Sequence, residues 1–317
     1  MEPVRKTHWQ KLRRAVVIYV LLPYFCVVLV FALIQRKLMY QPTRSDDLRV
    51  AAVGLKSDQF SDVSITTADG ETIRGWLLKS NAKEPRPLVL YFGGNAGNRF
   101  ERIDDLKEVA GCGYDVLVFD YRGFGDSTGS PSEAAITADA RACWDYALNE
   151  IGLDQDRIVV FGESLGGAVA LSLWADESSA GPAPAGAILN STFDSMPATV
   201  GSLYPAFPFR YFVWDRWSSI DRIGRVKTPI TIFHGSADSM VPIGHARRLA
   251  EAGGTRVTFH EIEGAEHNHL PHSQLRKTLK AITERMPGSA AVSTGQSVDQ
   301  PTQRYQPASP PRFRPAP

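Results

Sequence analysis

The sequence predicts a doubly wound α/β fold, in which helices cover both faces of a mostly parallel sheet. Short apolar runs alternate with helical stretches along most of the 317-residue chain. The short runs show no polar alternation, which is typical of strands buried on both faces of a parallel sheet. Regular alternation of such strands with helices favours the α/β class.

The expected elements follow in order. An antiparallel hairpin opens the domain, because strand patterns at residues 63–67 and 72–78 flank Asp69-Gly70, a common hairpin-turn pair. The expected buried strands are residues 88–92, 114–119, 158–161, 187–189, 230–233 and 257–262. The expected helices are residues 99–110, 133–150, 165–174, 245–251 and 273–285. Residues 38–286 are therefore expected to form one α/β domain.

A long apolar run precedes this domain. Residues 15–34 carry no charge, and as a helix they rise about 30 Å, the hydrocarbon thickness of a bilayer. Pro23 is expected to kink this helix, which membrane helices tolerate. A cleaved signal peptide and a buried core helix are the alternatives. The run is long for a signal peptide, and no small-x-small cleavage site precedes Gln35, so one transmembrane helix is predicted.

The charges on the two sides of this run suggest how the predicted transmembrane helix is oriented. The basic residues before it are Arg5, Lys6, Lys11, Arg13 and Arg14, and those after it are Arg36, Lys37, Arg44 and Arg49. This weak bias places the basic segment 1–14 in the cytoplasm and the α/β domain on the non-cytoplasmic side.

Residues 287–317 are rich in Pro, Ser, Gln and Gly and are expected to be a disordered tail.

One segment breaks the strand–helix rhythm. Residues 192–227 hold eight aromatic residues and are punctuated by prolines. The segment falls between two expected strands. It is either a loop-and-helix excursion packed on its own domain or a cap that walls a substrate pocket, and we refer to it as the cap.

Composition excludes several classes of function. A net charge of +1 without a basic, aromatic-rich stripe gives no reason to expect a nucleic-acid partner. Three scattered cysteines (Cys26, Cys112 and Cys143) form neither a disulfide framework nor a zinc site, and buried free thiols are expected. The glycine-rich run at residues 93–98 lacks the spacing of a phosphate-binding loop. No metal or organic cofactor is expected.

A candidate nucleophile lies in Gly162-Glu163-Ser164-Leu165-Gly166. A buried-strand pattern precedes this G-x-S-x-G motif and a helix of small residues follows it, which is the context of a nucleophile elbow. Ser164 is then lifted to the carboxyl edge of the sheet at a helix N-terminus. Developing negative charge is favoured there.

A serine hydroxyl needs a general base that is held by an acid. Asp238 follows the strand at residues 230–233, and His267 follows the strand at residues 257–262, in the order that such folds require. We expect His267 Nε2 to reach Ser164 Oγ while Nδ1–H points to Asp238. The alternatives left open are His269 and His272 as base and Asp194, Asp215 and Asp221 as acid. His234 is expected to end its strand and pack locally.

Two backbone N–H groups are expected to stabilise an oxyanion. One belongs to Leu165, the residue after the nucleophile. The other belongs to Asn95, in the glycine-rich loop after the strand at residues 88–92. Glycines there let the backbone approach a reacting carbonyl closely.

Five motifs follow one another along the chain: YFGGNAGN (91–98), FDYRGFGDSTGSPSE (119–133), FGESLGG (161–167), HGSADSMVP (234–242) and GAEHNHL (264–270). In this order they resemble the α/β-hydrolase superfamily, and more narrowly its single-pass, membrane-anchored branch. The resemblance covers residues 38–285 and implies an α/β-hydrolase fold with Ser164, Asp238 and His267 as triad and Asn95 and Leu165 as oxyanion donors. Members of the branch include lipid esterases, protein depalmitoylases and peptidase-like proteins.

The sequence departs from the family pattern at two places. Relatives often carry His where Gly93 stands, and Gly where Glu266 precedes the candidate base. Neither change removes an expected catalytic atom. We expect cleavage of an ester or thioester through an acyl-enzyme; the resemblance implies the reaction class but not the substrate. The aromatic cap and the expected membrane anchor suggest an acyl or lipid-like substrate near the bilayer. A serine peptidase or amidase, or a hydrolase-fold binding protein without turnover, are the alternatives.

Overall fold

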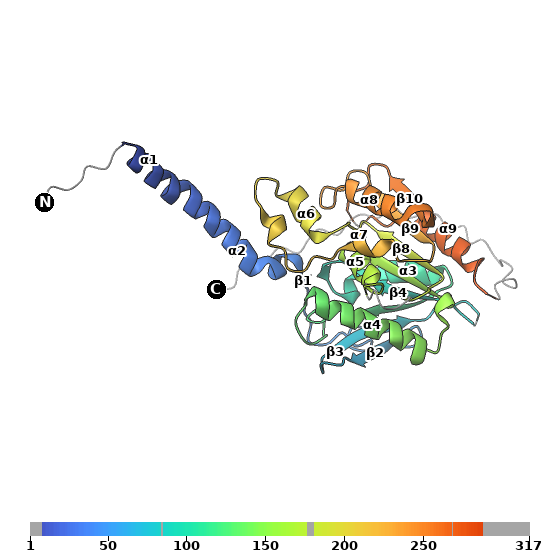
Figure 1. Ribbon diagram of the computed structural model, residues 1–317. Coiled ribbons are helices and arrows are strands. Elements are labelled where there is room, and N and C mark those ends of the chain that lie inside the picture. Colours follow the sequence, from blue (N-terminus) through green and yellow to red (C-terminus); the bar gives the residue numbers. More distant parts are fainter. Residues whose placement is uncertain (1–7, 84, 176–180, 268, 288–317) are drawn as a thin grey trace.

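The computed structural model describes residues 8–83, 85–175, 181–267 and 269–287, and Figure 1 shows their arrangement. A single long helix projects from a rounded α/β body. The first seven residues of the expected basic segment, and all of the expected tail beyond residue 287, lie outside the described residues.

The body is built on an eight-stranded sheet with the order β10-β9-β8-β7-β4-β6-β3-β2. The pairs β2–β3 and β3–β6 are antiparallel and the remaining pairs are parallel. This confirms the predicted fold class with its N-terminal hairpin. The strands are β2 (Phe60–Thr66), β3 (Thr72–Leu78), β4 (Leu88–Phe92), β6 (Asp115–Phe119), β7 (Ile158–Glu163), β8 (Gly186–Asn190), β9 (Ile230–Gly235) and β10 (Val257–Ile262).

Helices cover both faces of the sheet. Core residues of α4, α5 and α8 belong to one hydrophobic cluster, and those of α3 and α9 belong to the other. Alternate residues of β4 divide between the two: Leu88 and Leu90 join the first cluster, Val89 and Tyr91 the second. This division explains why the strand is apolar throughout. The helices are α3 (Ile103–Gly111), α4 (Glu133–Asn149), α5 (Leu165–Ser172), α8 (Gly244–Gly253) and α9 (His272–Thr283).

Some boundaries differ from those expected. The stretch expected to be helical from residue 99 begins as a 3₁₀ turn, η2 (Arg99–Arg102), in which the Asn98 side chain accepts a hydrogen bond from Phe100 N–H. α5, the helix that follows the candidate nucleophile, ends at Ser172, two residues before the end expected from the sequence. The hairpin strand β2 starts at Phe60, three residues before the expected position, and pairs with β3 over its whole length.

The N-terminal helix is continuous from His8 to Met39 and apolar enough to cross a membrane by length and composition. It comprises α1 (His8–Val16), a π-helical turn η1 (Val17–Leu21) and α2 (Leu22–Met39). The disturbance expected at Pro23 takes the form of this π-turn, because proline has no N–H to donate to the preceding turn. Cys26 is exposed on α2 and Cys112 is half-buried, so the expectation of buried thiols is correct for Cys143 alone.

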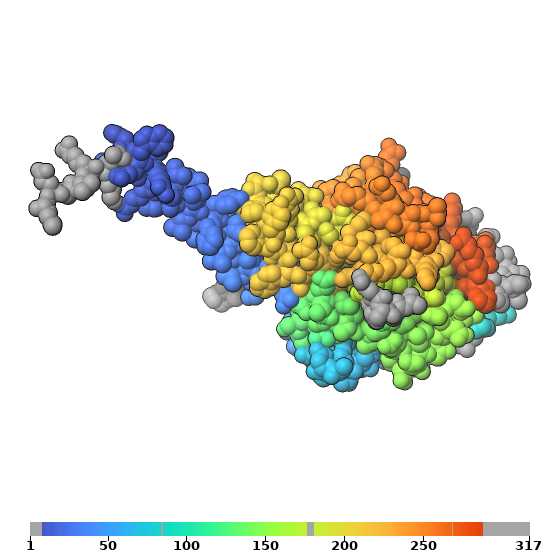
Figure 2. Space-filling view, in the orientation of Figure 1, coloured from blue at the N-terminus to red at the C-terminus, as the bar shows by residue number. Residues whose placement is uncertain are grey.

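The cap contains α6 (Met196–Leu203), the 3₁₀ turn η4 (Phe209–Tyr211) and α7 (Ser219–Ile223), between β8 and β9. Figure 2 shows it, in yellow, against the base of the blue N-terminal helix. A short parallel pair, β1 (Gln41–Pro42) with β5 (Ala96–Gly97), joins the end of that helix to the loop after β4. Two-residue strands carry no sequence pattern, and this pair was not predicted.

Candidate active site

Ser164 occupies a strained turn between β7 and α5. Its φ angle of 52° lies in the left-handed region, which non-glycine residues rarely adopt. A Cβ at Gly162 would lie 2.4 Å from Gly166 O, and one at Gly166 would lie 2.0 Å from Phe92 O. Both glycines are therefore required for strand and helix to meet this closely. The turn is the elbow that the sequence predicted, with Ser164 at the N-terminus of α5.

The structure brings the three expected side chains together. His267 Nε2 lies 3.0 Å from Ser164 Oγ, and His267 Nδ1 lies 2.7 Å from Asp238 Oδ2. A carboxylate only accepts hydrogen bonds, so Nδ1 carries the proton and Nε2 presents its lone pair to the serine hydroxyl. This is the geometry and tautomer that a base needs to take a proton from Ser164.

Asp238 is held by its own loop. Its Oδ1 accepts hydrogen bonds from the N–H groups of Met240 at 3.0 Å and Val241 at 2.8 Å. Burial alone would raise the pKa of this carboxyl, but hydrogen bonds from His234, His267 and Val241 N–H outweigh it and hold the pKa well below its ordinary value. Asp238 is therefore ionised across the neutral pH range, as an orienting acid must be.

His234 has a larger role than the sequence suggested. It lies in β9 as expected, but its Nε2 sits 2.7 Å from Val241 O and 3.3 Å from Asp238 Oδ2. The carbonyl can only accept, which places a proton on Nε2. The imidazole is fully buried, and its Nδ1 has no partner among the described residues. His234 thus fixes the loop that carries the acid. Its spacing of four residues from Asp238 was the available signal.

The alternative acids and bases are engaged elsewhere. Asp194 pairs with His245 and Arg248 of α8, while Asp215 binds Arg36 of α2, and Asp221 accepts from Ser218. These carboxylates hold the cap in place rather than approach Ser164. His269 is exposed, and His272 Nδ1 lies 3.5 Å from Glu108.

The loop after β4 passes directly beside the nucleophile. A Cβ at Gly94 would lie 3.7 Å from Ser164 Cβ. Asn95 is anchored on both sides by the end of α2: its side chain donates to Met39 O at 2.9 Å, and its carbonyl accepts from Gln41 N–H at 2.8 Å. Within the described residues, no acceptor is found for the backbone N–H of Asn95 or of Leu165. Both groups are free to bind an oxyanion.

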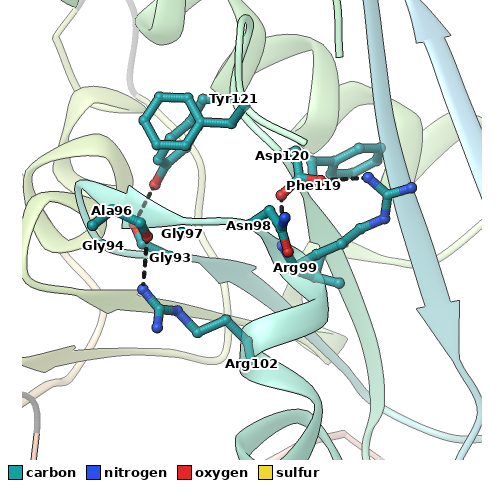
Figure 3. Close-up of a pocket in the computed structure, with 12 residues that line it drawn as sticks. Gly93, Gly94, Ala96, Gly97, Asn98, Arg99, Arg102, Phe119, Asp120 and Tyr121 are labelled. Carbon is teal, nitrogen blue, oxygen red and sulfur yellow. Dashed lines mark hydrogen bonds and ion pairs between the residues drawn. The ribbon is translucent and has the colours of Figure 1, made fainter. Parts of the chain in front are cut away.

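Figure 3 shows how this loop is held from two sides, by Tyr121 and by Arg102. Tyr121 OH donates to Gly93 O at 2.7 Å, and the Arg102 guanidinium donates to Ala96 O at 3.1 Å. Gly93 stands where relatives often carry His, and its backbone carbonyl is held by the hydroxyl of the buried Tyr121. Hydrogen bonds from two side chains thus hold the backbone of this glycine-rich loop.

Glu163, next to the nucleophile, supports the same loop. Its carboxylate accepts a hydrogen bond from Tyr91 OH at 2.8 Å and lies 3.6 Å from Arg102 Nε. A Cβ at Gly94 would lie 3.3 Å from Glu163 Oε1. Glu163 is buried under the loop and does not line the pocket above Ser164. Glu266, the other unexplained carboxylate, is exposed.

A cavity of about 290 Å³ opens above Ser164 and His267. Its wall is mostly apolar and comes from three parts of the chain: α2, the cap and the loop after β9. Asn95 and Leu165, the two expected oxyanion donors, also line it. Representative wall residues are Phe31 and Leu38 of α2, Met196 and Val200 of α6, and Met240. In the described parts of the chain, no cluster of His, Cys, Asp and Glu suited to a metal ion is found.

Comparison with known proteins agrees with this architecture. A family profile described as "alpha/beta hydrolase fold" matches residues 87–211. The Arabidopsis thaliana alpha/beta hydrolase domain-containing protein WAV2 is 31% identical over 257 residues, which cover 74% of this chain and 81% of WAV2. Lysophosphatidylserine lipase ABHD12 of Danio rerio is 33% identical over 189 residues, which cover 55% of this chain and 49% of ABHD12.

Solved structures show the same fold. A Pyrococcus furiosus esterase aligns with a TM-score of 0.61 and 19% identity, over 79% of this chain and 98% of the esterase. The chain therefore belongs to the α/β-hydrolase superfamily, in the branch that includes WAV2 and ABHD12. The resemblance read from the five motifs is confirmed at this level.

Proposed function

We propose that this chain is a membrane-anchored serine hydrolase that cleaves carboxylic esters or thioesters through an acyl-enzyme. The observation that carries the proposal is the continuous hydrogen-bond path from Ser164 through His267 to Asp238, at 3.0 and 2.7 Å. Ser164 and His267 line an apolar cavity, and Asn95 and Leu165, whose backbone N–H groups we propose as oxyanion donors, line it as well. A nucleophile, a base and its acid, and candidate oxyanion donors around one cavity are the parts that acyl transfer requires.

Acylation begins when Ser164 Oγ attacks the carbonyl carbon and its proton moves to His267 Nε2. The carbonyl oxygen becomes an oxyanion, which the N–H groups of Asn95 and Leu165 stabilise by about 3 kcal/mol each. The tetrahedral intermediate then collapses. The bond to the leaving alcohol or thiol breaks, and His267 Nε2–H donates its proton to that leaving group.

Deacylation repeats these steps with water. His267 takes a proton from water, and the resulting hydroxide attacks the acyl carbon. The acid product leaves, and Ser164 recovers its proton from His267. Throughout, Asp238 holds the imidazole by Nδ1–H and stabilises its charged form.

The N-terminal helix supports the membrane assignment. It runs from His8 to Met39, and its most apolar window is 6% buried. A helix of this length and exposure has no protein core to cover it, so we place residues 15–34 in a bilayer. The basic residues before the run favour an α/β domain on the non-cytoplasmic side.

The substrate we propose is an acyl or lipid-like ester. The apolar wall of the cavity suits an acyl chain, and ABHD12, a relative, is by name a lysophosphatidylserine lipase. The helix would hold the cavity at the membrane, where such substrates reside.

The test compares ester and amide substrates that carry the same acyl chain. We expect the purified full-length chain in detergent to hydrolyse a p-nitrophenyl ester with saturation kinetics, far faster than the matching anilide. Ser164→Ala should abolish turnover. Faster cleavage of the anilide would instead favour a peptidase or amidase, and no turnover of either would favour a binding protein.

A further inference from the structure

The cap contacts the second half of the N-terminal helix, which is the half nearer to the α/β body. Tyr24 stacks on Phe207 at 5.4 Å between ring centroids and donates a hydrogen bond to Ala206 O at 3.3 Å. About two turns further on, Phe31 stacks on Phe209 at 4.2 Å. These aromatic contacts hold the cap beside the apolar part of the helix.

Polar contacts complete the attachment at the end of the helix. Gln35 is buried; it donates to Phe212 O at 2.9 Å and accepts from Trp214 N–H at 2.8 Å. Arg36 binds both oxygens of Asp215, at 2.9 Å each. Bidentate pairs of this kind fix orientation as well as distance. The helix and the cap therefore move as one body.

This attachment places the cap at a definite depth. Tyr24 and Arg36 are twelve residues apart, which is about 18 Å of helix. Before Tyr24, residues 15–23 of the apolar run rise only about 14 Å, less than half of the roughly 30 Å that a hydrocarbon core requires. A bilayer that surrounds residues 15–34 must therefore also surround the part of the cap that contacts Tyr24 and Phe31.

The outer face of the cap has the chemistry for that environment. Outside the N-terminal helix, seven large apolar side chains are exposed among the described residues, and six of them lie on the cap or at the rim of the cavity. The six are Leu203, Tyr204, Tyr211, Phe212, Trp214 and Met240. Three of them, Leu203, Tyr204 and Met240, also line the cavity, so the exposed apolar group extends from the cap to the cavity wall. A concentration of exposed apolar side chains in one part of a protein is typical of a membrane-binding site. Aromatic residues of this type favour the boundary between headgroups and acyl chains.

Arg210 is the charged residue within the 3₁₀ turn on this face. Its guanidinium lies over the Tyr211 ring at 4.8 Å and donates to Tyr211 OH at 2.8 Å. A long arginine stem can keep its charge at headgroup level while its methylene groups lie against the acyl region. The charge is therefore compatible with a cap that sits near the headgroups.

The helix also forms part of the cavity wall. Phe31, Leu38 and Met39 line the cavity that contains Ser164. An acyl chain bound there would lie against the same helix that crosses the bilayer. The apolar side chains of α2 thus connect the lipid phase to the nucleophile, and the one polar α2 side chain in the described wall, Gln35, has its amide hydrogen-bonded to the cap.

From depth, surface chemistry and cavity wall together, we propose that the cap is embedded in the leaflet beside α2 and that the cavity receives an acyl chain from that leaflet along the helix. The proposal rests on the proposed function for its anchor and its hydrolytic site. Its partner is the lipid bilayer itself.

Depth-dependent quenching tests the embedding. The full-length chain, in a Cys26→Ser, Cys112→Ser background, is labelled with bimane at Tyr211→Cys and reconstituted in vesicles of brominated phosphatidylcholine. Leu29→Cys, on the exposed side of the helix, reports the anchor. Asp156→Cys is the control for a position in water, because Asp156 is exposed at the opposite end of β7 from Ser164. We expect strong quenching at positions 29 and 211 and none at 156.

The outcomes separate the claims. Quenching at position 29 but not at 211 overturns the embedded cap and leaves the anchor intact. Absence of quenching at position 29 overturns the anchor and the embedding together. Fluorophosphonate labelling of Ser164 in the same vesicles reports the hydrolase claim independently, so an unlabelled protein with a quenched position 211 contradicts the proposed function alone.

A chain-length comparison tests the cavity wall. Phe31→Trp adds bulk at a lining residue, and Leu33→Trp makes the matched change on an exposed side of the same helix. We expect Phe31→Trp to lower the ratio of kcat/KM for a sixteen-carbon ester over a four-carbon ester by about tenfold, and Leu33→Trp to leave this ratio unchanged. Equal ratios in both variants would contradict an acyl path along α2.

Discussion

Asp238 concentrates the electrostatics of the candidate site at one residue. One carboxylate oxygen accepts a hydrogen bond from His267 Nδ1–H and lies close to His234 Nε2. The other oxygen accepts hydrogen bonds from two backbone N–H groups. This arrangement keeps the carboxylate ionised and the histidine oriented. The chemistry we propose therefore depends on a charge that is buried yet fully hydrogen-bonded.

The first prediction concerns that charge. Asp238→Asn retains the shape of the side chain but favours the wrong tautomer of His267. We expect kcat to fall by about 10³- to 10⁴-fold with little change in KM. Steady-state ester hydrolysis measures this loss. Asp221→Asn, at a cap carboxylate that accepts a hydrogen bond from Ser218, should stay within about twofold of the unmodified chain; an equal loss in both variants would contradict the assignment.

The second prediction concerns stability and pH. The folded state depresses the pKa of Asp238, because hydrogen bonds from its neighbours outweigh the opposing effect of burial. A depressed carboxyl pKa stabilises the fold above the unfolded value of about 3.9, and this stabilisation is lost as pH falls below it. We expect the difference in free energy of unfolding between the unmodified chain and Asp238→Asn to shrink from about pH 6 to about pH 3. Urea denaturation measures it, and a difference that grows on acidification would contradict the account.

At the scale of elements, the elbow depends on the closest approach between strand and helix. β7 and α5 meet at Gly162 and Gly166, and the end of β4 and the loop after it lie against Gly166. These local features could be predicted, because an apolar strand, a G-x-S-x-G turn and a small-residue helix are adjacent in sequence. The contact of Glu163 with Tyr91 and Arg102 could not, because those residues lie on separate elements.

The third prediction compares two glycines. Gly166→Ala places a Cβ 2.0 Å from Phe92 O, where only backbone could move, whereas Gly111→Ala meets nothing within 4 Å at the end of α3. We expect Gly166→Ala to lower the free energy of unfolding by at least about 3 kcal/mol and to abolish activity. Gly111→Ala should leave stability equal or raise it by up to about 1 kcal/mol. Thermal unfolding distinguishes them, and similar melting temperatures would contradict the packing argument.

For the whole molecule, the N-terminal helix, the cap and the loop after β4 are connected by hydrogen bonds and an ion pair. Arg36 and Gln35 hold the cap, and the end of the same helix holds Asn95 through Met39 O and Gln41 N–H. The sequence predicted the helix and the cap as separate features. Their connection was not predictable, because ion pairs and two-residue strand pairs between distant segments leave no periodic pattern.

The fourth prediction tests this connection. Arg36→Met removes the charged partner of the buried Asp215, whose remaining hydrogen-bond partner among the described residues is the hydroxyl of Tyr40. We expect proteolysis of the cap in detergent to accelerate about tenfold, equivalent to roughly 1.4 kcal/mol of lost attachment. Lys37→Met, at the exposed neighbouring residue, is the matched control. Equal cleavage rates in the two variants would show that the pair does not hold the cap.

The central claim is that Ser164 is a nucleophile activated by His267 and Asp238. Intact-protein mass spectrometry after incubation with a fluorophosphonate tests it most directly. The account predicts one covalent adduct, mapped to Ser164, that is absent in Ser164→Ala and forms far more slowly in His267→Ala and Asp238→Asn. No adduct on the unmodified chain, or an equal adduct on Ser164→Ala, would contradict it.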